Sequence, residues 1–285
     1  MSGFPWNGSP IVHDVYEQKN YYIEYTTCKE PRAIVFFSGN GIFYPNDVET
    51  FTNTIIRKNR YEWQSIANSR KIRSNYAKII FVRDIYKQWY VAGINYKLDS
   101  VEAVIDFVRS ETSGYKLTTC GNSAGGYMAI LVGTILKAEK IFSFSGQFSI
   151  ENQVEKAPLL LKYKDDCSRN RYFSTNRYIS DMTKTGGGVY HFYPAKCEWD
   201  IEQLTTVDDV TQILTFAMDC KEHGKTVDPN CYKYILTMNT ASLKKFAEQY
   251  RDKLIDPDDL YRQIVPIYER IYIYIKQSVR KILRR

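Results

Sequence analysis

The sequence predicts an α/β protein with a mostly parallel central sheet flanked by helices. Three observations support this fold class: short apolar runs bounded by turn residues recur along the 285 residues, helix-like segments separate them, and the connections between the two are short. Continuous apolar runs are typical of strands covered on both faces. Strand–helix alternation in turn favours parallel strands joined by right-handed crossovers.

The expected strands follow one another at fairly regular intervals. The first, 21–28, alternates between apolar and polar residues, as an edge or antiparallel strand does. The remaining strands are continuous apolar runs, expected at 33–39, 77–84, 115–122, 140–146, 188–195 and 212–219.

Two helices are predicted with clear boundaries. Residues 98–114 form an amphipathic pattern that Asp99 or Ser100 can cap and that Gly114 follows. Its apolar stripe comprises Val101, Val104, Ile105 and Val108. Residues 123–137 form a more apolar segment, which predicts a more deeply buried helix.

We expect one domain over residues 1–256, interrupted by an insert at 150–187. The insert is polar, aromatic and basic, and it breaks the strand–helix rhythm directly after a strand. An excursion at that point is expected to lie like a lid over the carboxyl ends of the strands, where ligands bind in such sheets.

A basic amphipathic helix is expected at 257–285. Pro257 opens it, Pro266 is expected to kink or divide it, and isoleucines recur at helical spacing. One interpretation is attachment to an anionic membrane surface or to a glycan-assembly partner. The other is a helix packed on its own domain with a solvated basic tail.

The charge distribution bears on partners and location. Six cations without an acid account for most of the net charge of +7, namely Arg270, Lys276, Arg280, Lys281, Arg284 and Arg285. The rest of the chain is close to neutral, which argues against nucleic-acid binding. The amino terminus lacks the features of a signal peptide. We therefore expect a cytoplasmic protein, with peripheral attachment to the inner face of the membrane as a further expectation for residues 257–285.

The segment CGNSAGG, residues 120–126, carries the strongest chemical signal. It fits the pattern G-x-S-x-G, with an expected strand before it and an expected helix after it. That context places Ser123 on a sharp strand-to-helix turn with its hydroxyl exposed, as a nucleophile requires. The structural alternative is a serine that caps the helix.

A serine nucleophile needs a base, and the chain contains three histidines. His13 lies near the amino terminus, and His191 lies inside an expected strand, where a packed core histidine is the simpler interpretation. His223 follows the last apolar run, in a polar turn before Gly224. We therefore predict that His223 is the base, with an exposed turn histidine as the alternative.

The orienting acid is expected between the serine and the histidine in the chain. The segment KCEWDIEQ offers Asp200, which we favour, and Glu198 as the fallback; helix capping is the structural alternative for Asp200. The oxyanion hole is expected to use the backbone N–H of Ala124 and that of Asn40 or Gly41 in the loop FFSGNG. A plain Asn-Gly turn is the alternative for that loop.

In this order, CGNSAGG, SGNG, EWDIEQ and EHGKT resemble the α/β-hydrolase fold family over residues 20–240. Further segments, among them FVRDIYKQWYVAGI and SFSGQFS, resemble hydrolase-like proteins of bacterial capsular or O-antigen polysaccharide biosynthesis. The resemblance implies an esterase or O-acyltransferase acting on a glycan or glycan precursor. We expect no bound cofactor, and no metal site because the six cysteines form no CxxC pair; an acyl donor such as acetyl-CoA is expected if the chain is a transferase.

Two further groups of residues remain open at this point. Arg83, Asp84 and Trp89 follow an expected strand and either bind substrate or fix the loop. The insert's cations and aromatic rings suit either a lid for an anionic glycan or a solvated lid. A noncatalytic scaffold, which holds a glycan-assembly partner through the insert and the basic helix, is the rival to an enzyme.

Overall fold

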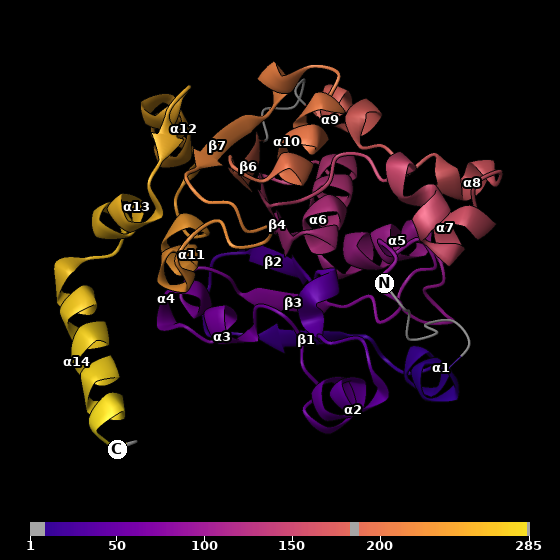
Figure 1. Cartoon of the computed structure of the whole chain (residues 1–285), viewed down its shortest axis with the longest axis horizontal. Helices are drawn as coiled ribbons and strands as arrows, with labels where there is room; N and C mark the ends of the chain where they lie inside the picture. The colour runs from indigo at the N-terminus through magenta and orange to yellow at the C-terminus, as the bar shows by residue number, and fades with distance from the viewer. Residues whose placement is uncertain (1–8, 183–187, 284–285) are drawn as a thin grey trace.

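The computed structural model describes residues 9–182 and 188–283 (Figure 1). Three parts of the expected organisation lie outside the described residues: 1–8 at the start of the domain, 183–187 at the end of the insert and 284–285 at the end of the basic helix. The described residues build one eight-stranded sheet with helices on both sides.

The sheet has the strand order β1-β3-β2-β4-β5-β6-β7-β8. Only the edge strand β1 runs antiparallel to its neighbour; the other pairs are parallel. The predicted mostly parallel sheet and its antiparallel first strand are thus confirmed. The strands are β1 (Tyr21–Tyr25), β2 (Arg32–Phe37), β3 (Lys78–Val82), β4 (Lys116–Asn122), β5 (Lys140–Phe144), β6 (Gly188–Pro194), β7 (Leu214–Met218) and β8 (Leu254–Ile255).

Sequence patterns did not reveal β8, because two residues show no periodicity. It pairs with β7 at the far edge of the sheet, where Ile255 is buried and Leu254 is exposed.

Alternate residues of the strands pack into two separate cores, one on each face of the sheet. Along β2, Val35 and Phe37 join the first core, whereas Ile34 and Phe36 join the second. Successive side chains of a strand point to opposite faces, so a fully apolar strand needs helices on both sides. This explains why the expected strands read as continuous apolar runs.

Helices on the first face include the two that the sequence predicts. The predicted helix 98–114 begins at the Ser100 cap, whose side chain accepts a hydrogen bond from the N–H of Ala103. The helices of this face are α1 (Pro10–Tyr16), α2 (Val48–Phe51), the π-helix η2 (Thr52–Arg57), α5 (Val101–Glu111), α6 (Ala124–Ile135) and α10 (Glu198–Thr205). As expected, α6 is the most deeply buried of them.

The second face is covered by helices from two separate parts of the chain, 64–73 and 229–264. They are α3 (Gln64–Ala67), α4 (Arg70–Arg73), α11 (Pro229–Ile235), α12 (Thr240–Tyr250) and α13 (Pro257–Ile264). Short 3-10 turns, η1 (Asn40–Ile42) and η5 (Val210–Gln212), precede or follow the strands.

The insert forms η3 (Glu151–Lys156), α7 (Pro158–Lys162), α8 (Cys167–Asn170) and α9 (Asn176–Met182). It joins the first core through buried side chains, including Leu160, Phe173 and Ile179. Tyr127 of α6 donates a hydrogen bond from its hydroxyl to the carbonyl of Tyr172 in the insert. The insert is therefore anchored along α6 by an apolar interface of its own.

The basic C-terminal segment is divided as Pro266 predicts. Helix α13 ends at Ile264, and α14 (Ile267–Leu283) continues after Pro266 as an arm at the side of the molecule (Figure 1). Within the described residues, no helix combines the length and the apolar character needed to cross a bilayer.

Candidate active site

Ser123 occupies the turn between β4 and α6. Its backbone has φ 53° and ψ −123°, a conformation that non-glycine residues adopt only under constraint. The neighbouring glycines explain how the turn is accommodated: a Cβ on Gly121 would lie 2.0 Å from the carbonyl oxygen of Gly125, and one on Gly125 would lie 2.2 Å from that of Phe37. Strand and helix therefore pack backbone to backbone, and Ser123 remains partly exposed at the turn.

The structure brings Ser123, His223 and Asp200 together. The imidazole Nε2 of His223 lies 2.9 Å from Ser123 Oγ, and its Nδ1 lies 2.8 Å from Asp200 Oδ2. His223 is in the loop after β7, and Asp200 is in the first turn of α10 after β6. The carboxyl ends of three parallel strands thus carry the three side chains to one edge of the sheet.

The side chains joined by these hydrogen bonds differ in their exposure to solvent. The side chain of Asp200 is 3% exposed and that of His223 is 24% exposed. The alternative acid, Glu198, lies exposed on the same turn of α10. A buried carboxylate bound to Nδ1–H leaves Nε2 free to accept the proton of the serine hydroxyl. The arrangement can therefore generate a serine alkoxide on demand.

Three neighbours hold the histidine loop, and none was among the predicted site residues. The Trp199 ring packs on the His223 ring with centroids 4.2 Å apart. Next to the histidine, the Gly224 N–H donates to Ser145 Oγ at 3.0 Å, and the Gly224 carbonyl accepts from Asn122 Nδ2 at 3.4 Å. Trp199 lies in the segment EWDIEQ and Ser145 in SFSGQFS, both of which carry the family resemblance. Nothing else in the sequence marks these two residues as part of the site.

The expected oxyanion loop lies directly beside the nucleophile turn. Asn40 and Gly41 form η1 after β2, and Gly39 contacts the backbone of Asn122, so closely that a Cβ there would be 2.4 Å from the Asn122 oxygen. The N–H of Ala124 begins α6, where the first N–H groups of a helix lack intrahelical acceptors. The predicted donors therefore come from the two segments that meet at Ser123.

Glu62 supports this loop and was not predicted from the sequence. Its carboxylate accepts a hydrogen bond from the Gly39 N–H at 2.5 Å. Burial raises the pKa of the Glu62 carboxyl, while the Gly39 N–H and the Arg60 charge oppose that rise. Glu62 follows a polar stretch without recognisable pattern, so no local signal marks it.

Gly39→Ala is expected to lower kcat for ester cleavage by about 10²-fold, the usual effect of a displaced oxyanion donor. The backbone of Gly39, with φ −82° and ψ 175°, suits alanine, so the effect comes from the clash with the Asn122 oxygen. Steady-state kinetics and thermal unfolding of the variant measure the two effects separately.

A matched control is Gly114→Ala, at the opposite end of β4. Gly114 has φ +82° and no contact that a Cβ would disturb, so this variant loses stability through backbone strain alone. Its kcat is expected to equal that of the wild type. Equal kcat values in both glycine variants would show that the loop does not act on the reaction.

Arg83 and Asp84 lie buried beneath the loop after β3. Asp84 accepts hydrogen bonds from the backbone N–H groups of Tyr86, Gln88 and Tyr90 at 2.8–2.9 Å. Arg83 donates to Asn20 Oδ1 and to the carbonyl of Arg60. These contacts favour the loop-fixing interpretation for both residues.

Trp89 differs from these two residues because it connects to the histidine loop. Its indole N–H donates to Gln147 Oε1 at 3.0 Å, and Gln147 Nε2 donates to the Ser145 carbonyl at 3.4 Å. Ser145 in turn contacts Gly224, next to His223. Trp89 thus lies in a hydrogen-bond network that reaches the site.

His191 lies inside β6 and is buried, as the sequence predicts. Its Nδ1 lies 3.2 Å from Ser143 Oγ. Burial lowers its pKa from 6.5 to about 4, with the Asp200 charge opposing the change. Folded His191 therefore stays neutral at neutral pH.

The free energy of unfolding is expected to fall as pH drops from about 6.5 to about 4. In this range His191 binds a proton in the unfolded protein but stays neutral in the folded protein. The contribution is about 3 kcal/mol. Asp84 acts in the opposite sense, since burial raises its pKa from 3.8 to about 6. Urea unfolding of wild type and His191→Gln over this pH range isolates the histidine: a constant difference between the two proteins would contradict the expectation.

Three of the insert's cations make contacts with carboxylates or backbone carbonyls. Lys164 pairs with Glu155 at 3.0 Å, and Arg171 pairs with Glu102 at 2.8 Å. Arg169 donates to the carbonyls of Val91 and Asp99 in the loop after β3. The contacts of Arg169 and Arg171 attach the insert to the loop after β3 and to α5, whereas the Lys164 pair lies within the insert.

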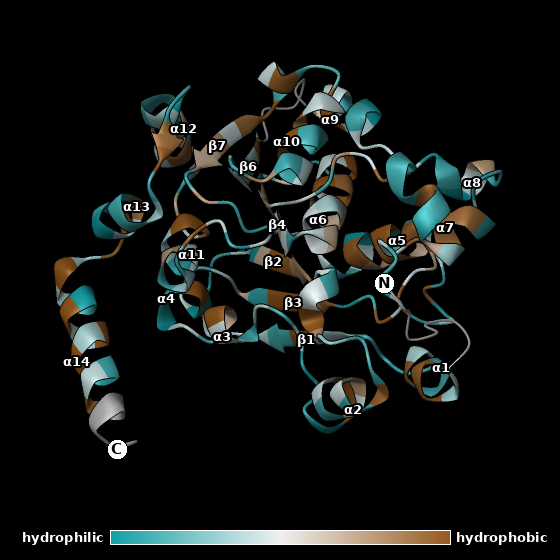
Figure 2. Ribbon diagram, in the orientation of Figure 1, coloured by the Kyte–Doolittle hydropathy of each residue, from teal (hydrophilic) through white to brown (hydrophobic). Residues whose placement is uncertain are grey.

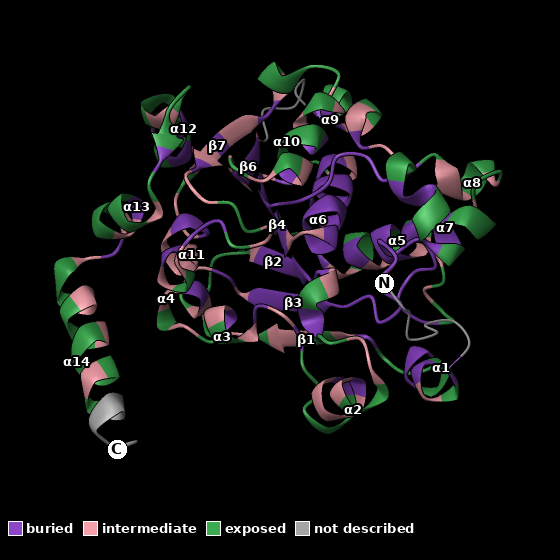
Figure 3. Cartoon of the chain, viewed as in Figure 1, coloured by how far each residue is buried: buried purple, intermediate pink, exposed green. Residues whose placement is uncertain are grey.

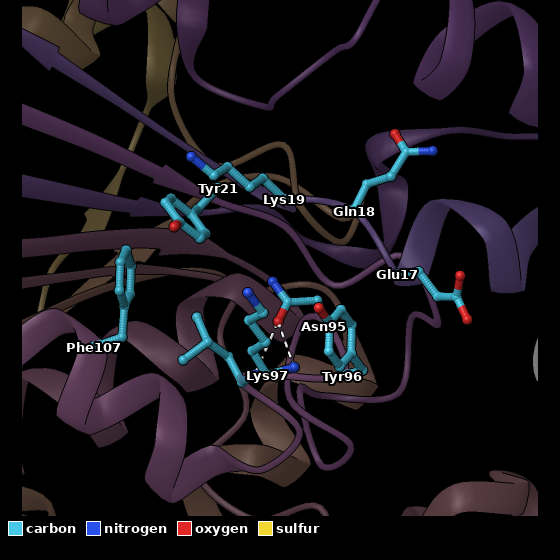
Figure 4. A pocket seen from close by; sticks show the side chains of 9 residues that line it. Glu17, Gln18, Lys19, Tyr21, Asn95, Tyr96, Lys97 and Phe107 are labelled. Carbon is cyan, nitrogen blue, oxygen red and sulfur yellow. Dashed lines mark hydrogen bonds between the residues drawn. The ribbon is translucent and has the colours of Figure 1, made fainter.

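A separate pocket lies near the edge strand β1. It has a volume of about 240 Å³ and is lined by residues 17–19, Tyr21, 95–98 and Phe107 (Figure 4). None of the three residues of the hydrogen-bonded chain lines it. Within the described ranges, no group of three or more His, Cys, Asp or Glu side chains is arranged to hold a metal ion.

Comparisons with known proteins agree with this architecture. No family model and no curated protein sequence matches the chain. The structure is similar to the capsule O-acetyltransferase of Neisseria meningitidis serogroup A in complex with caged gadolinium, with a TM-score of 0.52 and 13% identity over 81% of this chain and 92% of that one.

Two other similar structures have lower scores. A mutant of the same Neisseria enzyme in complex with CoA has a TM-score of 0.48 and 12% identity, covering 82% of this chain and 91% of that one. A carboxylesterase structure from the thaumarchaeon Nitrososphaera gargenis has a TM-score of 0.47 and 10% identity, covering 80% and 95%. The strand order, the turn at Ser123 and the similarity to the capsule O-acetyltransferase together show that the chain has the α/β-hydrolase fold.

Proposed function

We propose that the chain is an acyl-ester enzyme that works through a covalent acyl-serine intermediate. The observation that carries this proposal is the continuous hydrogen-bonded chain from Ser123 Oγ through His223 to the buried Asp200 carboxylate. A serine hydroxyl is a weak nucleophile unless a positioned base removes its proton. Here His223 is the base, and the Asp200 carboxylate orients its imidazole.

In the first half of the reaction, Ser123 Oγ attacks the acyl carbonyl carbon while its proton passes to His223 Nε2. The negative charge that develops on the carbonyl oxygen is stabilised by the N–H of Ala124 and by that of Asn40 or Gly41. When the tetrahedral intermediate collapses, the bond to the leaving group breaks, and that group takes the proton from His223. The acyl group then remains on Ser123.

In the second half, His223 Nε2 removes a proton from water or from a sugar hydroxyl, and the oxygen of that molecule attacks the carbonyl carbon of the acyl-serine. The bond between the acyl group and Ser123 Oγ then breaks, and Ser123 takes the proton back from His223. Water makes the chain an esterase, whereas a sugar hydroxyl makes it an O-acyltransferase. We take the glycan acceptor from the resemblance of the sequence segments, and the similarity to a capsule O-acetyltransferase supports the same choice. This branch requires an acyl donor, for which we propose acetyl-CoA, and Trp89 is the proposed contact for substrate.

The decisive experiment follows acetate by mass. Purified protein is incubated with acetyl-CoA or a chromogenic acetate, with and without capsular or O-antigen glycans, beside the Ser123→Ala variant. An acetylated glycan that appears only with wild-type protein supports transfer, and free acetate alone supports hydrolysis.

A fluorophosphonate probe separates an enzyme from a noncatalytic scaffold. Such probes react with activated serines, so wild-type protein is expected to be labelled at Ser123 and Ser123→Ala to remain unlabelled. A folded wild type that is neither labelled nor active on any acetate would favour the scaffold.

A further inference from the structure

Helix α14 exposes a continuous apolar face to solvent. Figure 2 shows brown segments along this helix, and Figure 3 shows that most of it is exposed. The exposed side chains lie at helical spacing, are between 47% and 72% exposed, and comprise Ile267, Tyr268, Ile271, Tyr272, Tyr274, Ile275 and Val279. Contiguous apolar patches of this kind mark interaction sites in proteins.

The side of the same helix that faces the protein is mostly polar. Glu269 pairs with the Lys233 ammonium and accepts a hydrogen bond from the Tyr234 hydroxyl, both on α11. A cleft of about 450 Å³ between α14 and residues of α11 and α13 is lined on the α14 side by Arg270, Ile273, Tyr274 and Gln277, so Tyr274 lies at the border of the exposed face. An amphipathic helix that packs on its own domain buries its apolar side, so α14 is oriented the opposite way. Its apolar face is left for a partner.

The charges of the segment select that partner. Glu269 is the one acid of α14, and Lys233 neutralises it. The segment's cations are Arg270, Lys276, Arg280, Lys281, Arg284 and Arg285. A second copy of the chain would bring two basic arrays together, which is unfavourable, whereas an anionic surface complements them.

We propose that α14 binds the surface of an anionic lipid bilayer. The helix lies in the plane of the bilayer, with its isoleucines among the acyl chains and its tyrosines at the level of the headgroups. The exposed Lys276 ammonium then lies near the lipid phosphates, and each cation of the segment near the surface adds to the attraction. This placement leaves the polar side of α14 packed on α11 and α13.

Sedimentation of the full chain with vesicles tests the proposal. We expect binding to vesicles of phosphatidylcholine mixed with phosphatidylglycerol, and much weaker binding to phosphatidylcholine alone. Ile271→Ser/Ile275→Ser should weaken binding about 100-fold or more, since both side chains leave water on binding. Val48→Ser/Ile56→Ser is the matched control, because these side chains are exposed to a similar extent on α2 and η2.

A charge variant tests the choice of lipid. Replacing three of the segment's cations by glutamine should weaken binding to the anionic vesicles about 100-fold and remove most of its salt dependence. The variant is Lys276→Gln/Arg280→Gln/Lys281→Gln. Its control removes the same charge from exposed positions elsewhere, as Lys58→Gln/Lys244→Gln/Lys245→Gln.

Three results would overturn the proposal. The first is the absence of vesicle binding, and the second is binding that the isoleucine variant leaves unchanged. The third is a dimer, detected by light scattering, that Ile271→Ser/Ile275→Ser dissociates while vesicles remain unbound; a second copy would then cover the face. Hydrolysis of a soluble acetate, measured in parallel, should not change in any of these variants.

Discussion

Replacement of Ser123 by alanine is expected to lower kcat/KM for acyl transfer by about 10⁴- to 10⁶-fold, because no acyl-enzyme forms without the hydroxyl. His223→Ala is expected to lose nearly as much, since the two side chains act as one unit across their 2.9 Å hydrogen bond. Rates with a chromogenic acetate, together with fluorophosphonate labelling of both variants, measure the losses.

The other two histidines supply the controls for this experiment. His13 is exposed on α1, and His13→Ala should retain full activity. His191→Gln should change stability, as argued above, without abolishing catalysis. An inactive His191→Gln beside an active His223→Ala would show that the base is misassigned.

Asp200→Asn is expected to lower kcat by about 10⁴-fold while leaving the fold intact. Asparagine presents an N–H where the His223 Nδ1–H now donates, so the imidazole turns or takes the wrong tautomer and Nε2 no longer accepts the serine proton. Steady-state kinetics on a soluble acetate, with circular dichroism as the check of folding, measure the effect.

Glu198→Gln is the matched control, because it removes the same charge from the same turn of α10. Glu198 is exposed whereas Asp200 is buried, so Glu198→Gln should change kcat by less than about twofold. If the glutamine variant were the inactive one of the pair, the fallback assignment made from the sequence would replace Asp200.

The choice between these two carboxylates illustrates what sequence reasoning left open. Both lie in the first turn of one helix, two residues apart, and such residues point to nearly opposite sides of the axis, about 160° apart. Only the packing of α10 against the sheet decides which of them faces the histidine. The order of serine, acid and histidine in the chain limits the acid to this turn. The sequence favours Asp200 but leaves Glu198 as a possible acid.

Local sequence patterns do not predict the hydrogen bonds that hold the loops of the site in place. Glu62 reaches Gly39, Ser145 reaches Gly224, and Asn122 reaches across 102 positions of the chain to the same glycine. Each contact depends on which strands are neighbours in the sheet. Strand order follows from the packing of the whole chain, so no stretch of the sequence carries it.

The sequence predicts helix α14 itself, but not which of its sides faces the solvent. Helical spacing of the isoleucines predicted an amphipathic helix, and Pro266 predicted its separation from α13. Whether the apolar side faces the domain or the solvent depends on Glu269, which pairs with Lys233 on α11. A pairing between residues that far apart cannot be read from the period of the helix.

The sequence by itself determined the element types, the predominantly parallel sheet and the turn that presents Ser123. These follow from the spacing of apolar residues and from glycines that allow close backbone contact, both of which are local properties. Only the tertiary structure decided that His223 and Asp200 meet that serine in hydrogen-bonding geometry, and which side of α14 remains exposed. Those outcomes depend on long-range packing, because contacts between different helices and strands determine which side chains are buried and which charges pair.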